Sequence, residues 1–178
     1  MAQRLYPVLT PQVIARRVAE LGGDISREYA GKDVLVVGVL KGSFMFVADL
    51  VRALTIPAQI DFVRLSSYGA KDVPGEIAFT QDLELSPEGK HILVVEDIVD
   101  TGHSMERLLK SLHGRGALSV KLCALIDKEE RRAANVIVDF FGFRLAKGFV
   151  VGYGLDFAED YRCLPGVFEL SQKRSPQS

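Results

Sequence analysis

Residues 94–104 read VVEDIVDTGHS, so an apolar strand end runs directly into a cluster of acids and a turn. Three carboxylates, those of Glu96, Asp97 and Asp100, fall within five positions. They are followed by residue types that favour tight turns and helix starts, Thr101, Gly102 and Ser104. The stretch therefore predicts a strand, a tight turn and a helix that begins near residue 103.

Short valine-rich runs alternate with amphipathic segments along the rest of the chain. One helix is predicted after the N-cap Thr10, and Gly22 and Gly23 in its middle are expected to bend or break it. Two further helices are predicted over 43–54 and 104–116. Strands are predicted over 33–40, 58–69, 91–98, 120–127, 135–143 and 148–156. This alternation indicates an α/β fold, a mostly parallel twisted sheet flanked by helices, whose ligands bind beyond the carboxyl ends of the strands.

Length and composition fit one soluble globular domain. The chain has 178 residues, of which 48% are hydrophobic and 25% charged. Its net charge of -1 gives no general attraction to nucleic acid or to an anionic membrane, so neither is expected as a partner. Two cysteines without metal-ligand spacing, and a start without a signal-like apolar stretch, predict a cytoplasmic protein with reduced thiols. Residues 70–90 mix glycine, proline and charge and predict a mobile loop or β-arm, and the polar tail from residue 171 is expected to fray.

The turn in residues 94–104 has the chemistry of a phosphate site. Free N–H groups at a helix start, together with the hydroxyls of Thr101 and Ser104, can hold a phosphate, and Gly102 lets the backbone approach it closely. The neighbouring carboxylates would repel a phosphate, so we expect them to accept hydrogen bonds from sugar hydroxyls, to hold Mg²⁺ or to take a proton. Together these features predict a site for a ribose 5-phosphate. The alternative is a surface turn whose charges are only solvated.

The longer stretch ILVVEDIVDTGHS, residues 92–104, resembles the phosphoribosyl pyrophosphate signature of the type I phosphoribosyltransferases at every position. Three other segments are similar to the pyrophosphate loop, the mobile-loop start and the purine-end segment of the hypoxanthine(-guanine) branch: GVLKGSFMFVADL, RLSSYG and FVVGYGLDFAEDYRCLP. The likeness extends over roughly residues 8–170. It implies one domain over 1–178, with a mobile arm near 70–90 and a small purine-binding hood formed by about 144–170.

The resemblance implies a Mg²⁺-dependent purine salvage enzyme. Its substrates would be phosphoribosyl pyrophosphate and hypoxanthine, and guanine as well, and its products IMP or GMP and pyrophosphate. Asp100 would be catalytic, handling the proton on the purine N7; its alternative role is to stabilise the turn. The ribose 5-phosphate would be bound by Glu96, Asp97, Asp100, Thr101, Gly102, Ser104 and the backbone N–H of His103.

Other site residues follow from the same resemblance. Pyrophosphate would meet Lys41 and Gly42, with a cis peptide between Leu40 and Lys41, and also Arg162. Ser67 and Tyr68 would begin the mobile loop that closes over the site. Metal ligands would be Glu96, Asp97 and Asp156. Lys41 could instead be an ordinary turn lysine, and Glu96 and Asp97 could be charges at the rim of the sheet.

The purine would be bound by Lys128, Phe149, Val150 and Asp156. Phe149 would stack on the base, Val150 would offer main-chain contacts, and Lys128 would donate to the exocyclic O6, which favours 6-oxopurines over adenine. Lys128 could instead belong to a plain charged helix start, DKEERR.

Two rival functions stay open, together with the oligomeric state. One rival is an RNA-binding regulator on the same fold, and the other is a transferase for xanthine and guanine or for a pyrimidine. Association into a homodimer or homotetramer is expected through FMFVADLV, residues 44–51, which is more apolar than one helix face needs.

Overall fold

A six-stranded sheet forms the centre of the computed structural model, which describes residues 3–65, 79–146 and 148–172. Its strand order is β4-β3-β2-β5-β6-β7. All neighbouring pairs are parallel except β3 with β4, so the prediction of a mostly parallel sheet is confirmed. The strands are β2 (Val34–Leu40), β3 (Gln59–Leu65), β4 (Phe79–Gln81), β5 (His91–Val99), β6 (Ser119–Asp127) and β7 (Phe140–Arg144).

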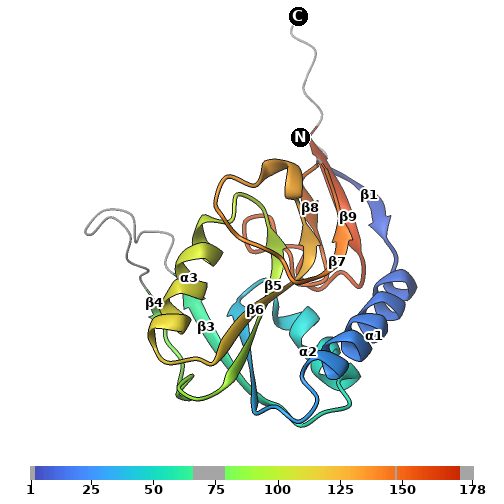
Figure 1. The fold of residues 1–178 in the computed structure, drawn as a ribbon. Coiled ribbons are helices and arrows are strands. Elements are labelled where there is room, and N and C mark those ends of the chain that lie inside the picture. The colour runs from blue at the N-terminus through green and yellow to red at the C-terminus, as the bar shows by residue number, and fades with distance from the viewer. Residues whose placement is uncertain (1–2, 66–78, 147, 173–178) are drawn as a thin grey trace, which may run out of the picture.

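Helices cover both faces of this sheet (Figure 1). On one face lie α1 (Pro11–Glu28) and α2 (Phe44–Ala53), and on the other lies α3 (His103–Gly114). Strand β2 shows why its valine-rich sequence suits this position. Val34 and Val36 pack into the cluster that contains the apolar residues of α1 and α2, whereas Leu35 and Val37 pack with those of α3. These four residues are thus buried alternately on the two faces, as expected for a central parallel strand.

Helix α1 begins as predicted but does not break. The hydroxyl of Thr10 accepts a hydrogen bond from the Val13 N–H at 3.3 Å, which makes Thr10 the N-cap. The helix continues through Gly22 and Gly23, so the expected break is wrong. Glycine at position 22 is explained by a tertiary contact. Helix α1 crosses α2 there, and an added Cβ at Gly22 would lie 2.6 Å from the Cβ of Ala53.

These two glycines give a matched test of the α1–α2 contact. Gly22→Ala is expected to lower the free energy of unfolding by about 1–3 kcal/mol, because the methyl group overpacks the crossing. Gly23→Ala is expected to raise it by about 0.5–1 kcal/mol, because the nearest atom is an Arg27 nitrogen 3.6 Å away and alanine favours the helix. Urea unfolding of both variants measures the two changes. Equal effects at the two positions would contradict the tight crossing.

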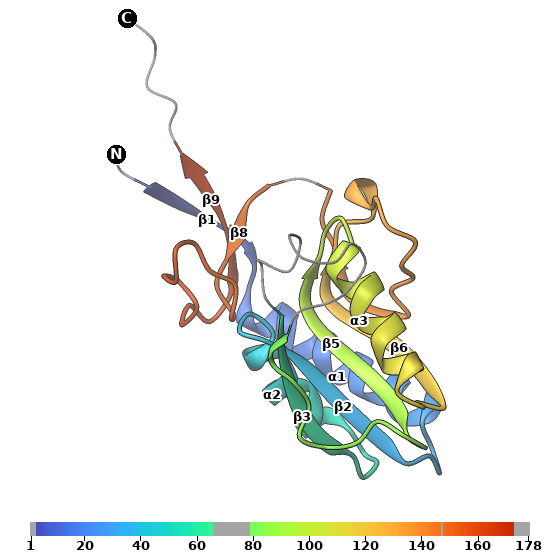
Figure 2. The same cartoon turned by 90° about the vertical axis from the view of Figure 1, so that its left-hand side faces the viewer.

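A second, three-stranded sheet stands over the carboxyl ends of the main strands (Figure 2). Its order is β1-β9-β8, all antiparallel, with β1 (Gln3–Leu9), β8 (Val150–Val151) and β9 (Val167–Gln172). Strand β1 was not predicted, and the tail expected to fray from residue 171 is paired in β9 as far as Gln172. The hood proposed for about 144–170 therefore includes the start of the chain as well.

Three predicted strands are shorter than expected. The segment 148–156 forms only the two residues of β8 before turning. The segment 135–143 becomes a strand only from Phe140. The segment 58–69 is a strand to Leu65, and Ser67, Tyr68 and the first part of the expected arm lie outside the described residues; the described part of the arm includes β4. In the described parts of the chain, no helix is long and apolar enough to span a membrane.

Candidate active site

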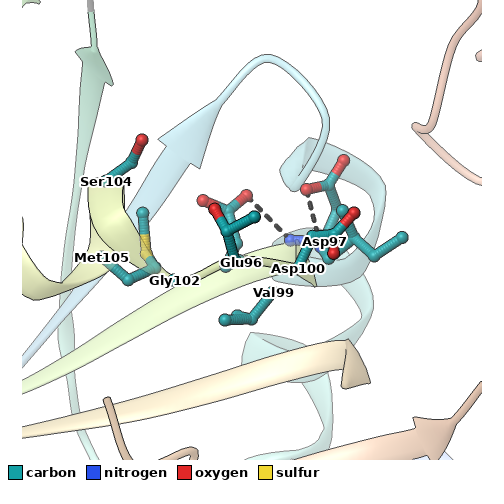
Figure 3. A pocket seen from close by; sticks show the side chains of 9 residues that line it. Glu96, Asp97, Val99, Asp100, Gly102, Ser104 and Met105 are labelled. Atoms are coloured by element: carbon teal, nitrogen blue, oxygen red, sulfur yellow. Dashed lines mark hydrogen bonds between the residues drawn. The ribbon is translucent and has the colours of Figure 1, made fainter. Parts of the chain in front are cut away.

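A pocket of about 250 Å³ lies where β5 ends and α3 begins (Figure 3). The close view shows Glu96, Asp97 and Asp100 on one side and Ser104 of α3 on the other. Every residue that lines the pocket, except Met105, belongs to the motif that the sequence singled out. Its polar lining consists of Glu96, Asp97, Asp100, Thr101, Gly102 and Ser104.

The turn between β5 and α3 is suited to an anion. Gly102 caps α3 with a φ of 87°, a left-handed conformation that favours glycine. The first bond of the helix joins the Glu106 N–H to the Gly102 carbonyl, so the N–H groups before Glu106 have no partner within the helix. With the nearby hydroxyls of Thr101 and Ser104, these groups can hold a phosphate.

Glu96 and Asp97 form an acidic pair against the loop that follows β2. The Asp97 N–H donates to Glu96 Oε1 at 3.0 Å, and the Ile98 N–H donates to Asp97 Oδ1 at 2.7 Å. Burial, together with the neighbouring Asp97, raises the pKa of Glu96 well above its usual range. At Gly42 an added Cβ would lie 1.8 Å from Asp97 Oδ2, so any larger residue there would have to displace this carboxylate.

Asp100 has two differently placed carboxylate oxygens. Its Oδ2 lies 3.0 Å from Arg131 Nη1. Its Oδ1 is buried and has no hydrogen-bond partner among the described residues. A buried acceptor without a protein partner, in the wall of a pocket, is suited to a hydrogen bond from a ligand.

The two cations expected to bind pyrophosphate, Lys41 and Arg162, contact the same carboxylate oxygen. The peptide between Leu40 and Lys41 is cis, as the resemblance implied. Lys41 Nζ donates to Glu159 Oε2 at 2.7 Å, and Arg162 Nη2 lies 3.4 Å from the same oxygen. The hydrogen bond from Lys41 lowers the pKa of Glu159. Arg162 Nη2 also lies 2.9 Å from Asp156 Oδ1, so three of the expected residues share one charged network with Glu159.

The expected purine residues lie near one another at the rim of the second sheet. Lys128 is buried, its N–H donates to the Val99 carbonyl at 3.0 Å, and its Nζ donates to the Gly148 carbonyl at 2.8 Å. Gly148 precedes Phe149, which is 52% exposed and packs nearly perpendicular to the Phe157 ring, with the ring centroids 5.6 Å apart. Val150 is buried in β8. Asp156 lies 2.9 Å from Arg162 Nη2 and accepts a hydrogen bond from the Glu159 N–H, and its expected contact with purine or metal stays a prediction.

Comparisons with known proteins agree with this geometry. Residues 8–158 match the family model described as "Phosphoribosyl transferase domain". The chain belongs to the phosphoribosyl transferase family. This confirms the resemblance seen in residues 92–104, and the fold of the transferase is the one that the family implies.

Named relatives of this transferase cover nearly all of it. The hypoxanthine phosphoribosyltransferase of Escherichia coli (strain K12) is 42% identical over 164 residues, which cover 90% of this chain and 92% of the relative. The hypoxanthine-guanine phosphoribosyltransferase of Bacillus subtilis (strain 168) is 42% identical over 161 residues, 90% of this chain and 89% of the relative. A crystal structure of a hypoxanthine phosphoribosyltransferase from Staphylococcus aureus superposes with a TM-score of 0.87 at 38% identity, covering 93% of this chain and 92% of that one.

Three charged residues of the transferase site were not predicted from the sequence. Glu159 lies between the two expected pyrophosphate cations. Arg131 and Arg132 lie against Asp100 and its backbone. The only sequence signal for these arginines was the charge run DKEERR, which is also typical of a solvated helix start. The structure instead gives a short 3-10 helix, Glu129–Arg131, after Lys128.

Proposed function

We propose that this chain is a purine salvage transferase, which moves the 5-phosphoribosyl group of phosphoribosyl pyrophosphate to hypoxanthine, and to guanine, and releases pyrophosphate. The observation that carries the proposal is the convergence of three subsites at the carboxyl ends of β2, β5 and β6. These are the phosphate turn at Gly102, the cations Lys41 and Arg162, and the buried Lys128 beside Phe149. The names of the relatives support the choice of base.

Each subsite has its own role in the transfer. The turn at Thr101–Ser104 holds the 5-phosphate, and Glu96 and Asp97 accept hydrogen bonds from the ribose hydroxyls. As the bond from the sugar to pyrophosphate breaks, positive charge grows on the ribose and negative charge on the leaving group. Lys41 and Arg162 stabilise the leaving group, while the nearby carboxylates stabilise the sugar.

Asp100 handles the proton of the purine. When the new bond forms at N9, the proton on N7 must leave, and the unpartnered Oδ1 of Asp100 is an acceptor in the wall of the pocket. Lys128 donates to the O6 of the base, and Phe149 covers its face. Asp156 holds Arg162 in place for pyrophosphate.

The acidic residues also fit Mg²⁺. Glu96 and Asp97 offer carboxylate oxygens, which Mg²⁺ prefers, and a cation would offset the cost of burying Glu96. Among the described residues no group of three or more histidine, cysteine or acidic side chains could hold a metal ion by itself. Mg²⁺ is commonly bound by one or two carboxylates together with waters and substrate phosphates. When bound, Mg²⁺ would neutralise charge on pyrophosphate. Asp156, the third expected ligand, is instead paired with Arg162.

A turnover assay with six bases tests the proposal. Purified protein is given phosphoribosyl pyrophosphate, Mg²⁺ and, in turn, hypoxanthine, guanine, xanthine, adenine, uracil and orotate. We expect hypoxanthine and guanine to give the highest kcat/KM. A preference for xanthine or a pyrimidine would replace the proposed substrate. RNA binding without turnover of any base would favour the regulatory alternative.

Glu159 is expected to compete with pyrophosphate for Lys41 and Arg162. Glu159→Gln should tighten the inhibition by pyrophosphate about threefold, because an exposed carboxylate contact of this kind contributes modestly. Asp160→Asn is the matched control, since it removes the same charge from the next residue, whose side chain is exposed. The inhibition constant of pyrophosphate is measured for both variants. Equal tightening by both would assign the effect to general charge rather than to Glu159.

We also propose that the protein is cytoplasmic and assembles into a homodimer or homotetramer. The apolar sequence of α2 supports association, since Phe44 stays 36% exposed. A surface groove of about 300 Å³ lies between α1 and α2, and its lining is apolar except for Asp49 and Arg52. Light scattering of the purified protein measures the assembly.

A further inference from the structure

Two consecutive arginines hold Asp100 from different sides. Arg131 Nη1 lies 3.0 Å from the carboxylate Oδ2 of Asp100. Arg132 Nε donates to the main-chain carbonyl of the same Asp100 at 3.1 Å. Both arginines follow Lys128 at the end of β6, so the segment that supplies the purine lysine also contacts the residue proposed to take the purine proton.

Arg132 fixes the backbone of the phosphate turn. Its guanidinium is largely buried and donates to the carbonyls of Val99 and Val136 and to Asp127 Oδ1, the last at 2.5 Å. Its Cδ would lie 2.8 Å from a Cβ added at Gly102, so its stem packs directly against the turn. Because a guanidinium offers five donors in a rigid plane, the single side chain of Arg132 can donate hydrogen bonds to β5, to β6 and to the loop that follows β6.

Arg131 acts on the carboxylate itself. Its side chain is 58% exposed, and its ion pair occupies Oδ2 of Asp100. The remaining oxygen, Oδ1, is the buried one that has no hydrogen-bond partner among the described residues. An ion pair to one oxygen restricts rotation of the carboxylate and so fixes the place of the other oxygen.

We propose that Arg131 and Arg132 are positioning residues for phosphoribosyl transfer. Arg132 holds the phosphate turn through main-chain carbonyls, and Arg131 holds the Asp100 carboxylate with Oδ1 available to the purine. Both act through Asp100 and the turn rather than on the reacting atoms. The inference rests on the proposed function, in which Asp100 receives the N7 proton.

The two arginines should give different kinetic signatures. Arg131→Gln should lower kcat about fivefold and leave the KM for phosphoribosyl pyrophosphate within about twofold, because an exposed ion pair positions its partner only modestly. Arg131→Lys, which keeps the charge, should recover most of the loss. Arg132→Lys should lower kcat and also raise that KM, because the whole turn moves. The Tm of Arg132→Lys is measured as well, to show whether this variant folds. If it does not fold, Arg131→Gln alone tests the inference.

Arg144→Gln is the matched control. Arg144 is 57% exposed, lies near the same segment and is ion-paired with Glu129 at 3.2 Å and with Asp127 at 3.9 Å rather than with Asp100. We expect wild-type kinetics for this variant. If Arg131→Gln behaves as Arg144→Gln does, or if it raises KM without lowering kcat, the proposed role of Arg131 is wrong.

A double-mutant cycle shows whether Arg131 acts through Asp100. In an Asp100→Asn background, Arg131→Gln should cause no further loss of kcat, because the carboxylate that it holds is gone. The same fivefold loss in both backgrounds would overturn the inference. Every rate is compared with the unsubstituted protein on the base that it uses best. If the unsubstituted protein prefers another base, the proposed substrate is wrong. The double-mutant cycle can still be run on that other base, so it tests the role of Arg131 separately.

Discussion

Replacing Asp100 by alanine is expected to lower kcat on the order of 100-fold, the scale at which positioned acid–base groups contribute. The KM for phosphoribosyl pyrophosphate should change less than about threefold, since the proposed phosphate site consists mainly of N–H groups and hydroxyls of the turn. The large loss of kcat is expected because Asp100 Oδ1, a buried acceptor without a hydrogen-bond partner among the described residues, would no longer be present to take the purine proton. Steady-state kinetics with both substrates varied measure the two constants.

Asparagine at the same position distinguishes the loss of a proton acceptor from the loss of side-chain volume. Asp100→Asn keeps an acceptor oxygen of similar size but cannot take a proton at neutral pH, so its kcat should fall nearly as far as that of Asp100→Ala. Asp33→Asn, which changes an acid paired with Lys90 just before β2, is the charge-matched control and should leave both constants unchanged. Equal losses in kcat and in affinity for phosphoribosyl pyrophosphate would instead make Asp100 a ribose-binding residue.

The central site was predictable because its parts are contiguous in the chain. Residues 92–104 carry a strand, a turn and a helix start in sequence order, and each has a local signal: buried valines, glycine and hydroxyl residues. The places of Lys41 and Lys128 followed from one rule, that parallel strands end at the same edge of a sheet. The structure places both lysines directly after β2 and β6.

The second sheet was only partly predictable because its pairing is long-range. Strand β1 at the start of the chain pairs with β9 near its end, and no periodicity in residues 3–9 indicates that partner. The segment 135–143 failed for a related reason. Its apolar residues suit a strand, but the chain just before it is held at the phosphate turn, because the Ala133 and Ala134 N–H groups donate to the Thr101 carbonyl. The segment meets β6 only at Asp139, which exchanges hydrogen bonds with Leu122 directly before β7 begins at Phe140.

Charged contacts across loops were the least predictable part of the site. Glu159, Arg131 and Arg132 lie on exposed-looking, charge-rich segments, where sequence alone cannot separate a solvated side chain from one that meets a distant partner. Arg132 is largely buried, although the sequence around it reads as surface. Arg132 stabilises the turn by donating hydrogen bonds to the carbonyls of Val99, Asp100 and Val136, and these carbonyls come close together only in the folded chain.

Replacing Lys128 by methionine is expected to remove most of the preference for 6-oxopurines. Lys128 is buried, and its Nζ donates to the Gly148 carbonyl at 2.8 Å, directly before Phe149 in the chain. A hydrogen bond from a charged group to O6 is worth about 1.5–3 kcal/mol, so the ratio of kcat/KM for hypoxanthine to that for adenine should fall roughly 10- to 100-fold. Competition between the two bases in one reaction measures this ratio directly.

The same strand supplies the control for this substitution. Lys121 lies toward the opposite end of β6, where it donates to Glu28 at 2.7 Å, so Lys121→Met removes a partly buried lysine without touching the purine end. Its ratio of hypoxanthine to adenine efficiency should equal that of the wild type. If Lys128→Met slows both bases alike, Lys128 only anchors the Gly148 carbonyl and shapes the hood. In that case the choice of base would depend on main-chain groups near Val150, which side-chain substitution leaves in place.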